Sequence, residues 1–159
     1  MAYLIDGNNL LGYYSPANIR DPRSKYELVM KLQIFQRIKR TRIILVFDGY
    51  PDSNLLSKQL RDKKFYVFYP PPDQNADQKI KEVILKQTDL RRFFVVSSDR
   101  DIKNFAKSKG AKTVGCEEFS RQLEKALKKY KISKEKEKNV TSPSPLEINQ
   151  WLDIFKKKK

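Results

Sequence analysis

The sequence predicts an α/β fold, a three-layer sandwich in which helices cover both faces of a mostly parallel sheet. Short apolar runs of strand length alternate with stretches of helical periodicity, and this order implies crossover connections between parallel strands. The apolar runs are continuous rather than alternating, as in strands that are buried on both faces. With 159 residues, 39% of them hydrophobic, the chain has the size and composition of one compact domain.

Five strands are expected, and the first four of them are short apolar runs. The five strands are residues 3–5, 43–47, 65–69, 93–96 and 112–114. Three consecutive prolines, Pro70 to Pro72, follow the third run and end it, because proline cannot donate to a strand ladder. The fifth strand has only three residues, and we expect it at an edge of the sheet.

Helices are expected between and after these strands. They are residues 25–38, 54–62, 76–86, 102–107 and 117–130. Leu28, Leu32 and Phe35 recur at helical spacing in the first of them, and Leu123 and Leu127 do so in the last.

The composition predicts three parts along the chain. Residues 1–130 form the α/β domain, and residues 131–145 are rich in Lys, Glu, Ser and Pro, which is typical of a flexible linker. A capping box with proline at the first helical position then opens an amphipathic helix over residues 146–159, which ends in four lysines. This helix either packs back on the domain or docks a partner through Trp151 and Phe155.

The net charge of +15 favours a polyanionic partner, and nucleic acid is the commonest one. The alternative is a lysine-rich surface that only keeps the protein in solution. The chain contains no histidine, which excludes Ser-His and Cys-His dyads, histidine-based RNA cleavage and histidine-based zinc sites. Any catalysis must therefore use carboxylates, lysine, tyrosine or a hard metal ion.

The cysteine content and the lengths of the apolar runs bear on the compartment. Cys116 is the only cysteine, so no internal disulfide can form. No signal peptide is recognisable, and the longest apolar runs have the length of strands rather than of a membrane span. We expect a cytoplasmic protein without a membrane partner.

Aspartates follow the predicted strands. In open α/β sheets, ligands bind outside the carboxyl ends of the strands. The residues expected at that edge are Asp6, Asp48, Asp77, Asp99 and Asp101. We call this set the acidic pole.

Carboxylates gathered in this way repel one another, and a bound cation relieves the repulsion. Mg²⁺ or Mn²⁺ is the expected ion, because hard ions prefer carboxylate oxygen and water. Such an ion binds phosphate oxygens and activates water for attack at phosphorus. Each aspartate alone could equally cap a helix or make a turn, but four strand-end segments that each carry one favour a shared site.

Basic residues are spread through the domain, and most of them are expected on solvated helix faces. Arg100 and Lys103 flank the last two aspartates and are the candidates for phosphate contacts. Tyr13, Tyr14 and Tyr50 are expected in loops, where they either stack on bases or pack locally.

Four segments together carry a family resemblance. They are Leu4-Ile5-Asp6-Gly7-Asn8-Asn9, Val46-Phe47-Asp48-Gly49, Asn75-Ala76-Asp77 and Ser97-Ser98-Asp99-Arg100-Asp101. Over residues 2–130 the chain resembles the NYN domain, specifically its YacP-like group, which belongs to the PIN-like nucleases. The resemblance implies a PIN/5′-nuclease-like central sheet.

The resemblance also implies an endoribonuclease that depends on Mg²⁺ or Mn²⁺ and acts in bacterial RNA turnover, for some members with ribosomes as partners. It makes Asp6, Asp77 and Asp99 the catalytic metal ligands, with Asp48 and Asp101 as accessory ligands. The residues expected to contact substrate are Asn8, Asn9, Ser98, Arg100 and Lys103. The chain departs from the family pattern at Asn8, where tyrosine is usual, and at residues 70–74, which replace an acidic–threonine segment.

Two other functions remain open at this stage. One is a non-catalytic RNA- or ribosome-binding module with a vestigial acidic pocket, and the other is a DNA-directed, structure-specific nuclease. A phosphatase or a kinase-like receiver is disfavoured, because this much positive charge is unusual for a protein with a small substrate.

Overall fold

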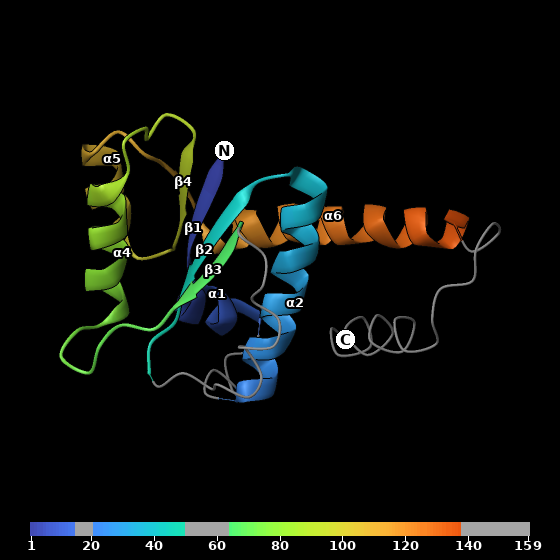
Figure 1. Cartoon of the computed structure of the whole chain (residues 1–159), viewed down its shortest axis with the longest axis horizontal. Helices are drawn as coiled ribbons and strands as arrows, with labels where there is room; N and C mark the ends of the chain where they lie inside the picture. Colours follow the sequence, from blue (N-terminus) through green and yellow to red (C-terminus); the bar gives the residue numbers. More distant parts are fainter. Residues whose placement is uncertain (15–20, 50–63, 138–159) are drawn as a thin grey trace.

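A computed structural model describes residues 1–14, 21–49 and 64–137 (Figure 1). Its strands are β1 (Ala2–Asp6), β2 (Arg42–Val46), β3 (Phe65–Phe68), β4 (Phe93–Val96) and β5 (Lys112–Val114). They form one sheet in the order β3-β2-β1-β4-β5, and each neighbouring pair is parallel. All five expected strands are present, with β5 at an edge, and the α/β fold class is confirmed.

Helices cover both faces of this sheet, which gives the predicted three layers (Figure 1). The described helices are α1 (Gly7–Tyr14), α2 (Pro22–Lys39), α4 (Ala76–Lys86), α5 (Arg100–Ser108) and α6 (Cys116–Glu137). The core over one face is built with α1, α2 and α6, and the core over the other face with α4 and α5. No helix in the described ranges is both long and apolar enough to cross a membrane.

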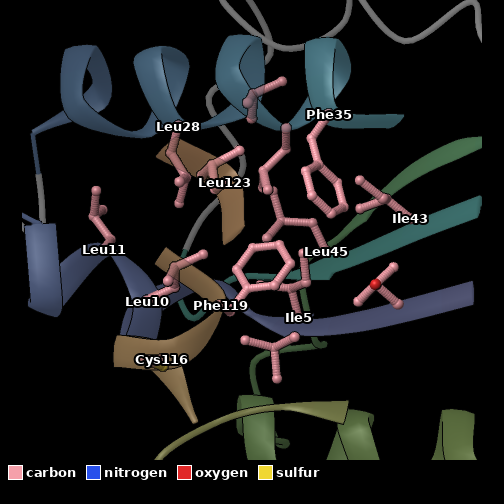
Figure 2. Close-up of a cluster of buried hydrophobic side chains, with 14 of the residues drawn as sticks. Ile5, Leu10, Leu11, Leu28, Phe35, Ile43, Leu45, Cys116, Phe119 and Leu123 are labelled. Atoms are coloured by element: carbon pink, nitrogen blue, oxygen red, sulfur yellow. The ribbon is translucent and has the colours of Figure 1, made fainter. Parts of the chain in front are cut away.

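The larger core lies between the sheet and the α1, α2 and α6 layer (Figure 2). Phe35 of α2 and Phe119 of α6 meet edge to face at 5.3 Å between ring centroids, and Tyr3 of β1 contacts both rings. Leu10 and Leu123 are fully buried in the same cluster. This packing fixes α2 and α6 against β1.

Two expectations about helices were wrong. The segment after β1 was expected to be a loop, but it forms α1, so Tyr13 and Tyr14 stand at a helix end. The Tyr14 hydroxyl donates toward Glu124 (3.2 Å) and the Ser120 carbonyl (3.4 Å), which ties α1 to α6. The last helix continues to Glu137, seven residues past Tyr130, so the first part of the predicted linker is helical.

Several expectations lie outside the described residues. They are the helix at 54–62, Tyr50, the rest of the linker, and the helix at 146–159 with Trp151 and Phe155. The division of the chain into three parts therefore stays a prediction.

The topology determines where a ligand site would lie. β1 is central and pairs with β2 on one side and β4 on the other. After β1 the chain passes to α1 and α2 on one face of the sheet. After β4 it passes to α5 on the opposite face, so the connections from these two neighbouring strands lead to opposite faces. In open α/β sheets a ligand site is expected at such a switch point, here at the carboxyl ends of β1 and β4.

Candidate active site

All five aspartates of the acidic pole lie at the carboxyl edge of the sheet. Asp6 is the last residue of β1, and Asp48 follows β2 by two residues. Asp77 is in the first turn of α4, Asp99 is the N-cap of α5, and Asp101 is in the first turn of α5. Four separate segments thus deliver carboxylates to the switch point and its surroundings.

Asp6 is the buried member of the pole, with 6% of its surface exposed. Its carboxylate accepts a hydrogen bond from the Ser97 hydroxyl (3.2 Å) and a long one from the Asn9 backbone N–H (3.5 Å). Burial raises the pKa of Asp6 to about 6, and the nearby carboxylates of Asp77 and Asp48 add to the rise, while the two hydrogen bonds oppose it. Asp6 therefore changes its charge near neutral pH.

The same mutual repulsion acts on Asp77. Burial raises its pKa first, and the carboxylates of Asp99, Asp48 and Asp101 raise it further, while Lys81 lowers it. Together with the effects on Asp6, these interactions place all five aspartates within electrostatic reach of their neighbours.

Asn8 and Asn9 join the loops around the pole. The Asn8 side-chain oxygen accepts the Asp48 backbone N–H at 2.8 Å, which connects α1 to the loop after β2. The Asn9 side-chain oxygen accepts the Ser98 backbone N–H at 2.8 Å and the Cys116 thiol at 2.8 Å. Both were expected to contact substrate, but their amide oxygens bind within the protein.

Two of the aspartates also accept hydrogen bonds from the first turns of helices. The Asp48 carboxylate accepts the Ala76 N–H at 2.7 Å, beside the capping box that Asn75 makes at the start of α4. The Asp99 carboxylate accepts the Asp101 N–H at 2.8 Å and the Ile102 N–H at 3.3 Å. Asp48 and Asp99 can therefore belong to the pole and also bind the N-terminus of a helix.

Ser97 is a site residue that the sequence reasoning missed. It is fully buried, donates to Asp6 and accepts the Asp99 backbone N–H at 3.1 Å. Its hydroxyl thus links the ends of β1 and β4 across the switch point. Ser98, which had been singled out instead, accepts the Cys116 N–H at 3.1 Å, and this bond fixes the start of α6. The Ser97-Ser98 doublet after an apolar run was the available signal.

Lys81 is the second residue that was missed. Its ammonium group binds the Asp101 carboxylate at 2.6 Å, and this hydrogen bond raises the pKa of Lys81, with Asp77 and Asp99 adding to the rise. Lys81 lies one helical turn after Asp77, so the spacing of the two residues in α4 was the available signal.

The predicted cations are placed on α5. Arg100 is exposed in the first turn, and Lys103 is half-buried one turn later. The Lys103 ammonium group lies 3.6 Å from the position of a Cβ atom built on Gly115, so it sits beside the β5–α6 junction. Both residues lie in the same helix as Asp101 and follow the Asp99 N-cap in the chain.

The carboxylates of the pole are suitable ligands for a hard divalent ion. They raise one another's pKa by repulsion, and a cation between them would relieve this repulsion. In the described part of the chain, however, no group of three or more His, Cys, Asp or Glu side chains is placed so that it could hold a metal ion. Mg²⁺ commonly takes only one or two protein carboxylates and keeps several waters. An open set of carboxylates is compatible with that mode of binding.

A family model for the YacP-like NYN domain matches residues 3–156. The chain belongs to this family. The match confirms the resemblance seen in the motifs and runs beyond Tyr130, where that resemblance was expected to end. Membership in this family, which is related to the PIN-like nucleases, supports a nuclease or RNA-related function.

Solved structures show the same fold. A crystal structure of Rae1 (YacP) from Bacillus subtilis is 20% identical to the chain, with a TM-score of 0.75 over 99% of this chain and 93% of that one. A tryptophan-to-leucine mutant of the same protein is 19% identical, with a TM-score of 0.67 over 100% and 93%. No curated protein matches the chain.

Proposed function

We propose that this YacP-like NYN domain is a metal-dependent endoribonuclease that hydrolyses RNA phosphodiester bonds and leaves a 5′-phosphate and a 3′-hydroxyl. The observation that carries the proposal is the acidic pole itself: four segments bring five aspartates to the carboxyl edge of the sheet, where burial and neighbouring carboxylates raise the pKa values of Asp6 and Asp77, in a chain whose net charge is +15. Carboxylates suit a metal ion, and the surrounding bases suit a polyanion.

Asp6, Asp77 and Asp99 are the proposed ligands of Mg²⁺ or Mn²⁺, with Asp48 and Asp101 as accessory ligands. When bound, such an ion supplies positive charge for the phosphate and lowers the pKa of water. Ser97 and the Asn9 backbone hold the Asp6 carboxylate, so the ligand does not need to be ordered when the ion arrives. Lys81 holds Asp101 in the same way.

Arg100 and Lys103 are the proposed phosphate contacts beside the pole, and the nitrogen atoms of the Asn8 and Asn9 amides and the exposed Ser98 are further candidates. We propose RNA as the partner and bacterial RNA turnover in the cytoplasm as the setting. Ribosome binding is not required by this proposal.

The decisive experiment incubates labelled single-stranded RNA with the protein, with Mn²⁺ or with a chelator. The wild type should cut only with Mn²⁺, and Asp6→Asn and Asp99→Asn should lose cutting by at least about a hundredfold. Asp89→Asn is the matched control, because Asp89 is exposed and contacts Arg91 before β4, at the opposite edge of the sheet. Equal cutting by all variants would identify a contaminant and refute the proposal.

A second readout does not depend on cutting. Mn²⁺ should raise the melting temperature of the wild type more at pH 8 than at pH 5, because Asp6, with its pKa of about 6, is ionised only at the higher pH. Asp6→Asn should show little stabilisation at either pH, and Asp89→Asn should behave like the wild type.

A non-catalytic RNA-binding module is the second candidate, and the lack of a ready three-residue metal group among the described residues favours it. Tight RNA binding without cutting under any metal condition would support this module. Cutting of single-stranded DNA at a rate equal to that of RNA would instead support a DNA-directed nuclease.

A further inference from the structure

The second half of α6 extends beyond the core of the protein. Leu127 is its last fully buried residue, and ten further residues continue the helix to Glu137. Figure 1 shows α6 running past α2, away from the sheet. Ile132 in this part exposes 53% of its surface. This part of α6 is therefore not held in place by burial of an apolar face.

Three of the lysines on this helix share one face, while Lys128, Lys131 and Lys134 lie elsewhere around it. At 100° per residue, Lys125, Lys129 and Lys136 lie within about 40° of one another around the helix axis. All three are exposed. Phe119, Leu123 and Leu127 face the core from the opposite side of the helix. We call Lys125, Lys129 and Lys136 the lysine row, which spans roughly 16 Å along the axis.

Among the side chains that the structure describes, no ion pair joins an acid to the row. Glu118 is the last described acid on the same face and stands about two turns before Lys125. Glu124 accepts a hydrogen bond from Tyr14, and Glu135 lies about 80–120° around the axis from the lysines of the row. The row is a linear positive surface along the exposed side of the helix.

The helix that carries the row starts beside the candidate active site. Cys116, the first residue of α6, is bonded to Asn9 and Ser98 at the acidic pole. From there α6 runs away from the pole for about 33 Å, at 1.5 Å per residue. A strand bound at the pole and continuing along this helix would pass the three lysines in turn.

We infer that the lysine row of α6 is a binding surface for the backbone of a single-stranded RNA segment outside the cleavage site. Ammonium groups on flexible stems suit phosphates as point charges, and a row without bulky aromatic neighbours suits backbone contact without sequence preference. The inference rests on the proposed function in taking RNA as the polyanion, but it does not require that the pole be catalytic.

The test measures binding of a labelled single-stranded RNA by fluorescence anisotropy, in a chelator, over a series of salt concentrations. The row variant carries Lys125→Gln, Lys129→Gln and Lys136→Gln. The control variant carries Lys39→Gln, Lys86→Gln and Lys107→Gln, which remove the same charge from exposed positions in the last turns of α2, α4 and α5. The two variants have equal net charges, each three units below the wild type. A purely nonspecific electrostatic attraction to RNA would therefore weaken equally in both.

The row variant should bind at least about tenfold more weakly, and the slope of log Kobs against log salt should become shallower by about 2, at roughly 0.7 per phosphate contact. The control variant should change by less than about twofold. Lys129→Gln alone should give about a third of the change in slope, which provides a test if the triple variant does not fold. Equal weakening in the two triple variants, no weakening in the row variant, or no RNA binding by the wild type would overturn the inference.

Failure of the inference and failure of the proposed function give different results. A wild type that binds through the row but never cuts would overturn the nuclease and leave the row standing. If the wild type cuts with Mn²⁺ but the row variant binds RNA as tightly as the wild type, the inference about the row is overturned and the nuclease proposal stands.

Discussion

Burial of the Asp6 carboxylate costs stability whenever that group is charged. Its pKa in the folded protein is about 6, above the value of 3.8 for an unperturbed side chain. An acid whose folded pKa is raised penalises folding at high pH, because the unfolded chain releases the proton more readily. The penalty is absent below about pH 4, grows as pH rises toward 6, and is complete above it. The protein keeps this charge at the centre of its acidic pole despite the cost.

Replacement of this carboxylate should therefore stabilise the metal-free protein. In a chelator at pH 8, Asp6→Asn should raise the free energy of unfolding by roughly 1–3 kcal/mol, and the gain should disappear near pH 4. Urea unfolding at several pH values measures it. Asp89→Asn is the control and should not raise the free energy of unfolding, because hydrogen bonds from Arg91 lower the pKa of Asp89 and favour its charged form in the folded protein. A gain for Asp6→Asn that is independent of pH would contradict the electrostatic explanation.

Gly7 is required by close packing at the end of β1. A Cβ atom at this position would lie 2.6 Å from the Phe47 ring and 2.8 Å from the Val46 carbonyl oxygen. Gly7→Ala should therefore cost about 1–3 kcal/mol in stability and displace Asp6 and Asn8 on either side of it. At Gly115 the added Cβ would be in ordinary contact, 3.6 Å from Lys103, so Gly115→Ala should cost less. Chemical denaturation of both variants compares them, and equal losses would refute the steric argument.

At the scale of helices, the residues of α1 explain why this helix was not predicted. Gly7, Asn8 and Asn9 have low helix propensity and favour turns when judged locally. In the folded protein their helix is held by burial of Leu10 and Leu11 and by the bonds of the two asparagine side chains to distant loops. Among the described helices, only α4, with its amphipathic pattern and the Asn75 cap, was bounded correctly from sequence.

The length of α6 was underestimated for a related reason. Lys and Glu after Tyr130 are typical of linkers, but they are also strong helix formers, and an existing helix extends through them at little cost. The apolar pattern ends near Leu127, so the sequence shows where burial stops and not where the helix stops.

This difference between the two halves of α6 predicts different responses to truncation of side chains. Phe119→Ala should lose about 3–5 kcal/mol of stability, because Phe119 is fully buried against Tyr3 and Phe35. Ile132→Ala should change stability by less than about 0.5 kcal/mol, because that side chain is largely exposed. Urea unfolding measures both, and a large loss at Ile132 would show that the end of α6 packs against other parts of the protein.

Across the whole molecule, the position of the acidic pole was predictable, whereas its supporting bonds were not. Parallel strands bring their carboxyl ends to one edge, so aspartates after apolar runs could be assigned to that edge from sequence alone. The bonds of Ser97 to Asp6 and of Cys116 to Asn9 join residues far apart in the chain. Such pairs depend on the register of β1 with β4 and on the packing of α6, and neither leaves a local pattern.

The sheet order also predicts how stability is distributed. β1 is paired on both sides and its Leu4 and Ile5 are fully buried, while β5 is a short edge strand. In native-state hydrogen exchange, the amides of Leu4 and Ile5 should exchange only through global unfolding, and the amide of Thr113 should exchange faster through local opening. Equal protection of the two strands would contradict this gradient.

The central position of β1 has a consequence during synthesis of the chain. β1 is made before both of its neighbours, and the neighbour on its second side, β4, is translated more than eighty residues later. Until β4 and the first turn of α5 leave the ribosome, the nascent chain lacks Ser97 and Asp99 and cannot complete the acidic pole. If the pole cuts RNA, a nascent chain shorter than this cannot cut the message that encodes it.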